Sequence, residues 1–193
     1  MNIGILFQPC IVIFVRTRIV QNDMGILESI DKRDLRELLC MEWMTHDGMW
    51  FYNVFHKCGA KAASDLNRAA IQSMSAFEVP RLKKVMGVDE VTTYEQLKDF
   101  IEGAFELIGA DFMQFRRQYP GNNVVRWDAP EGQCFAYRGV KRIGALDDYD
   151  CGIFYRVEAW LKALGIGFRV TPEVHGCLMH QGKHCYREYT LDM

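Results

Sequence analysis

The fold is decided by the C-terminal segment Tyr149–Met193, which reads YDCGIFYRVEAWLKALGIGFRVTPEVHGCLMHQGKHCYREYTLDM. From Tyr149 to Leu164 the apolar residues recur at helical spacing and a glycine follows, which predicts a long helix. Two strand-like runs, Gly167–Cys177 and His184–Leu191, flank a short turn. The segment therefore predicts a helix followed by an antiparallel pair of strands.

The preceding chain predicts three helices and one further hairpin. Two capping-box spacings, Thr92 with Glu95 and Thr93 with Gln96, open the best marked of these helices. Helices first, then a hairpin, a helix and a hairpin, predict an α+β domain with an antiparallel four-stranded sheet and an inserted long helix. The expected elements are a helix from Asp31 to Lys57, a helix from Ala60 to Val85 that bends or restarts at Pro80, a helix through Leu97 to Ile108, and a hairpin of Phe112–Tyr119 and Asn123–Asp128.

Composition excludes several classes of protein. The chain has 193 residues, of which 49% are hydrophobic and 25% charged, so it can form one globular domain and is not disordered throughout. Its formal net charge of −2 provides no general attraction for nucleic acid or for an anionic membrane. We therefore expect a local site for a small molecule, with no nucleic-acid partner.

The N-terminal stretch Ile3–Val15 is the only long apolar run in the sequence. It lacks the flanking features of a signal peptide and is shorter than the ~20 residues of a membrane-spanning helix. We expect residues 1–23 to be an appendage outside the fold, with an additional strand as the alternative, and residues 24–193 to form a single α+β ligand-binding domain. Without an export signal, a cytoplasmic, reducing compartment is expected.

Four of the seven cysteines lie in the last 60 residues, at Cys134, Cys151, Cys177 and Cys185. In a reducing compartment such a cluster indicates a metal site rather than disulfides. Four thiolates suit a closed, tetrahedral, structural zinc site. Because no CxxC motif is present and free cysteines are often simply buried, the spacing leaves both zinc binding and four core thiols open.

The same tail resembles the end of the 4-vinyl-reductase-type small-molecule-binding domain. That family closes with a helix, a strand ending in Glu-x-x-Cys, a glycine-containing turn and a second cysteine. The resemblance implies Zn²⁺ bound by three cysteines that match this pattern, Cys151, Cys177 and Cys185. Val174 stands where the family has its ligating glutamate, so Cys134 is expected as the fourth ligand and His175 as the alternative.

Over a longer span, residues 31–191 resemble an uncharacterised prokaryotic family grouped near the amino-thiazoline-carboxylate hydrolases. The resemblance rests on Trp43–Phe51, Arg81–Lys84 and the four late cysteines. Related domains often form dimers, so a homodimer is expected from the resemblance.

A cluster of aromatic and polar residues marks the first long helix. Trp43, His46 and Trp50 share a helix face, with Phe51 beside them, and we expect these four to bind a ligand. The alternative is a packed core in which His46 is hydrogen-bonded. Gly48 indicates space or a close approach at this face, whereas Asp47 points in another direction and is expected to be solvated.

Two functions follow from these observations. The first is a zinc-containing domain, without catalytic activity of its own, that binds a small aromatic or hydrocarbon-like molecule. The second is a hydrolase of a small cyclic amide-like or thiazoline substrate that uses His46 and Asp47 or the metal. A closed zinc site with four cysteines leaves no position for water, which favours binding.

Overall fold

The computed structural model describes residues 25–173 and 175–193, and the chain divides into two compact units. The first unit ends at Asp31, and its described part contains the short helix α1 (Ile26–Ser29). The second unit, Lys32–Met193, holds all the other elements. The expected appendage, residues 1–23, lies outside the described residues.

Five helices belong to the second unit. A capping box at Thr93 and Gln96 opens α4, as the sequence predicts. Gly59, with φ 85°, separates the first two long helices, and this backbone conformation favours glycine. The helices are α2 (Lys32–Cys58), α3 (Ala60–Met86), α4 (Tyr94–Ile108), α5 (Phe135–Arg142) and α6 (Gly152–Ala163).

The sheet has four antiparallel strands in the order β1-β2-β4-β3. The register pairs Val125 with Tyr189 and Ala129 with Cys185, so these side chains share one face, while Arg126 pairs with Glu188 on the other. This confirms the α+β class with helices before the sheet and α6 between the two hairpins. The strands are β1 (Arg116–Gly121), β2 (Val124–Ala129), β3 (Gly167–Thr171) and β4 (Cys185–Asp192).

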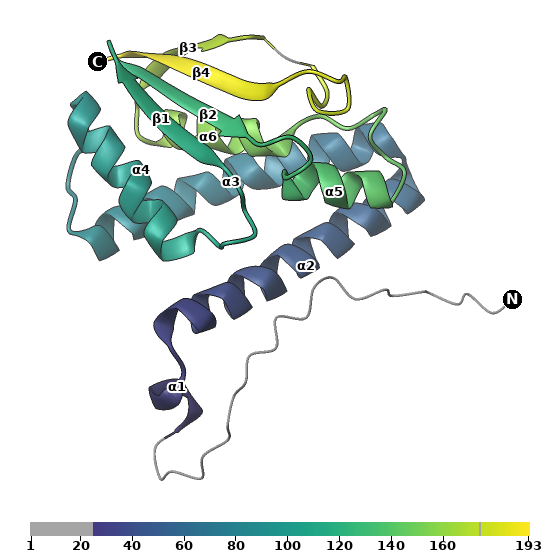
Figure 1. Ribbon diagram of the computed structural model, residues 1–193, viewed down its shortest axis with the longest axis horizontal. Helices are drawn as coiled ribbons and strands as arrows, with labels where there is room; N and C mark the ends of the chain where they lie inside the picture. The colour runs from purple at the N-terminus through teal and green to yellow at the C-terminus, as the bar shows by residue number, and fades with distance from the viewer. Residues whose placement is uncertain (1–24, 174) are drawn as a thin grey trace, which may run out of the picture. The chain divides into compact units, whose positions relative to one another are not determined.

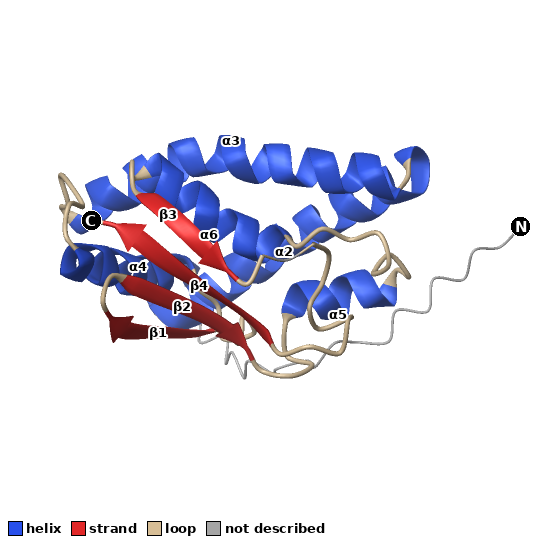
Figure 2. Cartoon of the chain, turned by 90° about the horizontal axis from the view of Figure 1, so that it is seen from above, coloured by secondary structure: helices blue, strands red, loops and turns tan. Residues whose placement is uncertain are grey.

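Helices α3, α4 and α6 lie along one face of the sheet (Figures 1 and 2). Helix α6 packs against α3 and β3, and α3 packs in turn against α2. The core between these layers is built from the inner sheet face, α4 and α6, through buried residues such as Phe100, Trp127, Phe154, Trp160 and Tyr189. The opposite sheet face carries polar groups, for example the 2.7 Å ion pair of Arg126 with Glu188.

Three local expectations are corrected. Helix α3 does not restart at Pro80 but continues through it, because Ala76 and Pro80 are both exposed and water can satisfy the Ala76 carbonyl that loses its bond. Strand β3 ends at Thr171, before Pro172, which has no N–H for the ladder. Helix α5 was not expected at all. Among the described residues, no helix is long and apolar enough to cross a membrane.

Candidate functional site

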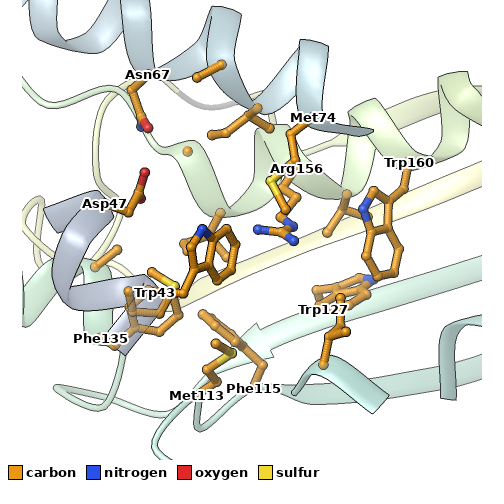
Figure 3. A pocket seen from close by; sticks show the side chains of 18 of the residues that line it. Trp43, Asp47, Asn67, Met74, Met113, Phe115, Trp127, Phe135, Arg156 and Trp160 are labelled. Atoms are coloured by element: carbon orange, nitrogen blue, oxygen red, sulfur yellow. The ribbon is translucent and has the colours of Figure 1, made fainter. Parts of the chain in front are cut away.

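A cavity of about 280 Å³ lies between the helical layer and the inner face of the sheet (Figure 3). Its walls consist mainly of aromatic, methionine and aliphatic side chains. They come from α2, α3, α4, α5, α6 and β2 and from the loops around them. The lining residues are Trp43, Met44, Asp47, Asn67, Ala70, Ile71, Met74, Phe105, Ile108, Met113, Phe115, Trp127, Phe135, Ala136, Tyr149, Gly152, Ile153, Arg156, Val157 and Trp160.

Helical periodicity explains how two helices, α3 and α6, supply nearly half of this lining. On α3, Asn67, Ile71 and Met74 are spaced by four and three residues and therefore share one face. On α6, Ile153 and Val157 share a face in the same way. Gly152 keeps α6 close to α3, because a Cβ there would lie 2.9 Å from the Asn67 Nδ2 atom.

Glu78 fixes the aromatic wall at one side of the cavity. Trp160 donates its indole N–H to Glu78 Oε2 at 2.7 Å, and Arg156 forms an ion pair with Glu78 Oε1. The Arg156 guanidinium also lies 5.0 Å from the centroid of the Trp43 ring. These contacts join α2, α3 and α6 around the cavity.

Three other polar groups in the lining have no such partner. Within the described part of the chain, no hydrogen bond or ion pair involves the Asp47 carboxylate or the Asn67 amide, and the Trp127 N–H has no hydrogen-bond partner. Burial raises the pKa of Asp47, while the charges of Arg156 and His46 act to lower it. The Asp47 carboxylate and the Asn67 amide are therefore open to a polar ligand atom, whereas the Trp127 N–H is itself buried.

The predicted ligand residues are only partly brought together here. Trp43 lines the cavity, but His46 and Trp50 are exposed and are not among the lining residues. Phe51 is buried and packs edge-on against Tyr149, with ring centroids 6.0 Å apart. Asp47, expected to be solvated, is half-buried in the cavity wall.

Of the two alternatives for Gly48, the close approach is excluded and the space is found. A Cβ at this position would meet nothing within 4 Å among the described residues. The cavity lies on the neighbouring face of α2, which carries Trp43 and Asp47.

The four late cysteines line one second, small cavity of about 10 Å³. Cys134 is the N-cap of α5 and accepts a hydrogen bond from the Tyr137 N–H at 3.5 Å, while Cys151 is the N-cap of α6. Cys177 lies in the loop after β3, and Cys185 begins β4. The fold thus brings together the four residues that the sequence singled out. Ala136 and Tyr149 line both cavities.

Burial favours the neutral form of three of these thiols. It raises the pKa of Cys134 and Cys185, and it raises that of Cys151 to about 11. Neighbouring thiols add to the shift, because deprotonated cysteines would repel one another. Backbone N–H groups at the start of α5 and α6 act in the opposite direction on Cys134 and Cys151.

The arrangement around the small cavity is not that of a formed metal site. Across residues 25–173 and 175–193, no group of three or more His, Cys, Asp or Glu side chains is placed to hold a metal ion. His175, the alternative ligand, is exposed and does not line this cavity. The donor chemistry of four cysteines nevertheless fits zinc.

Sequence reasoning did not assign a ligand role to Asn67, Trp127, Arg156 or Trp160. A signal existed for Arg156, since this cation interrupts the apolar stripe that Ile153, Val157 and Trp160 form on α6. No comparable signal marks Asn67, which looks like a surface residue until α6 packs over it.

Comparison with known proteins gives a family but no activity. A model described as "Family of unknown function (DUF6125)" matches residues 28–191, and the chain belongs to this family. No curated protein matches the chain, and no solved structure matches it either.

Proposed function

We propose that this member of the DUF6125 family is a small-molecule-binding domain whose ligand is largely apolar and aromatic. The observation that carries the proposal is the 280 Å³ cavity lined by Trp43, Trp127 and Trp160. Ligand sites are typically concave and apolar with a few placed polar groups, and Asp47, Asn67 and Arg156 are such groups here.

The volume sets the size of the ligand. An apolar cavity of about 150 Å³ is large enough to bind benzene. The present cavity is nearly twice as large, so it has room for a fused two-ring aromatic with a short substituent.

Hydrolysis of a small cyclic amide or thiazoline is the alternative, and it has less support. It was expected to use His46 and Asp47 or the metal, and of these two residues only Asp47 lines the cavity. A general base needs to reach the reacting proton, and the exposed His46 has no such access to a ligand in this cavity.

Zinc is part of the same proposal. We place it with Cys134, Cys151, Cys177 and Cys185, because these four thiols surround one small cavity. Bound zinc would supply structural stability by fixing the starts of α5, α6 and β4, since metal binding is coupled to folding. Cys134 is preferred over His175 because it lines the cavity with the other three.

The proposal also covers the cellular compartment and the oligomeric state of the domain. Four reduced thiols require a reducing compartment, so we place the protein in the cytoplasm. A homodimer is supported by apolar side chains that α2 exposes, such as Leu38, Leu39 and Met41. Sedimentation equilibrium of the purified chain tests the dimer.

Filling the cavity tests the binding function. Ala70 lines the cavity and its neighbour Ala69 does not, while both residues are exposed, so A70F and A69F form a matched pair. Isothermal titration calorimetry with 3-ethylindole should show one site per chain in the wild type and in A69F, and at least about tenfold weaker binding in A70F. Equal binding by both variants, or no binding by the wild type, would contradict the proposal.

A further inference from the structure

The charged groups of the cavity indicate which substituent its ligand carries. Of the lining residues in the described part of the chain, Arg156 and Asp47 are charged. Figure 3 shows the Arg156 guanidinium between the rings of Trp43 and Trp160, with Asp47 further along the wall.

Arg156 already has its counterion. Glu78 accepts from Arg156 with one carboxylate oxygen and from the Trp160 indole with the other, so both oxygens of this buried carboxylate are used. An anionic ligand group would have to compete with Glu78 for the guanidinium. The cation in the wall is therefore neutralised before any ligand binds.

Unlike Arg156, Asp47 has no counterion in an ion pair among the described residues. Its carboxylate is half-buried and has no hydrogen bond or ion pair in residues 25–173 and 175–193. Burial raises its pKa, as expected for a carboxylate removed from water, and this effect exceeds the opposing influence of Arg156 and His46. In Figure 3 the polar ends of Asp47 and Asn67 are turned toward one another, and among the described residues the Asn67 amide also has no hydrogen-bond partner.

The aromatic walls of the cavity also favour a cationic ligand. Arg156, Glu78 and Asp47 together carry one net negative charge, and three indole rings line the space around them. Aromatic faces attract cations, particularly where water is excluded. A single ammonium group on an aromatic ligand would neutralise the cavity.

We propose that the ligand is an arylalkylamine, that is, an aromatic ring carrying a short alkylammonium group that binds the Asp47 carboxylate and the Asn67 carbonyl. The ring occupies the space between the tryptophans. This inference rests on the proposed binding function, of which it specifies the ligand class.

Three probes with the same ring and a two-carbon chain test it: tryptamine, neutral 3-ethylindole and anionic indole-3-propionate. Titration calorimetry of the full chain at pH 7 should give tryptamine the highest affinity, about 10- to 100-fold above 3-ethylindole, as for a hydrogen bond to a charged group. In D47N this preference should disappear, while 3-ethylindole still binds and thereby shows that the cavity is intact.

H46Q is the matched control, because His46 is the neighbouring residue on α2 but is exposed and outside the lining. It should keep the preference for tryptamine. Equal affinities for tryptamine and 3-ethylindole, the strongest binding for indole-3-propionate, or an unchanged preference in D47N would overturn the inference and leave the binding function standing. Failure of all three probes to bind the wild type would overturn both.

Discussion

Glu78 of α3 accepts the indole N–H of Trp160 of α6 at 2.7 Å, and this contact joins the two helices beside the cavity. Trp160 and Trp127 are both buried tryptophans of the lining, but the N–H of Trp127 has no partner within the described residues. Comparing substitutions of Trp160 and Trp127 therefore separates the contribution of the hydrogen bond to stability from the cost of losing part of an indole ring.

Replacing each tryptophan by phenylalanine should give unequal losses of stability. W160F removes one of the two partners of the buried Glu78 carboxylate, the other being Arg156, and should lower the free energy of unfolding by about 1–3 kcal/mol more than W127F. Urea denaturation of the two variants and the wild type measures the difference. A W127F loss as large as that of W160F would show that the Glu78 bond contributes nothing.

The pH dependence follows from the raised pKa of Asp47. A carboxyl group with a higher pKa in the folded than in the unfolded chain binds protons better when folded, so its ionisation lowers stability as pH rises above about 3.9. D47N should therefore be more stable than the wild type at pH 7, and the difference should shrink as pH falls through the folded-state pKa of Asp47. Urea denaturation at a series of pH values measures this, and a difference that grows on acidification would contradict it.

Ionisation of Asp47, which lowers the stability of the domain, should raise its affinity for tryptamine. The ammonium needs an ionised Asp47, so its affinity should fall as pH is lowered from 7 toward 4, while D47N should show a flat profile. Arg156 and His46 are the charged groups that act on Asp47, and H46Q should retain the wild-type fall if Asp47 is the titrating group. If the affinity of D47N for tryptamine also falls on acidification, a group other than Asp47 is responsible for the pH dependence.

Zinc content should depend on the cysteines of the small cavity. Elemental analysis of protein prepared without chelator should give one zinc per chain in the wild type, less in C177A and C185A, and an unchanged amount in C58A, whose thiol is exposed and outside that cavity. A wild type without zinc would contradict the metal proposal.

Removal of that zinc should destabilise the domain. The thiols would be left buried around one cavity without their cation, so chelation should lower the melting temperature measured by circular dichroism. An unchanged melting temperature after confirmed zinc loss would exclude a structural role.

The sequence predicted most of the elements because their signals are local. The Thr93 capping box, the glycine after α2 and the alternation in β2 and β4 act over a few residues. Helix α5 was missed because it has only eight residues and its N-cap is a cysteine, which is not a usual capping residue. The meeting of the four cysteines followed from chain order around the two hairpins.

The ligand cavity could be predicted only in part, because six elements far apart in the sequence form it. Apolar residues occur on several sides of α2, so periodicity could not decide whether Trp43 faces inward together with His46 and Trp50 or together with Asp47. The packing of α3 and α6 decides this. Trp43, 36% exposed, and the half-buried Asp47 line the cavity, while Trp50, 41% exposed, does not.

The four tryptophans offer the most direct test of the central claim, that an aromatic molecule occupies this cavity. Three of them line it and Trp50 does not. In protein labelled with 5-fluorotryptophan, with each resonance assigned by substitution to phenylalanine, saturating 3-ethylindole should shift the ¹⁹F signals of Trp43, Trp127 and Trp160 and leave Trp50 unchanged. Four unchanged signals, or a shift confined to Trp50, would contradict the account.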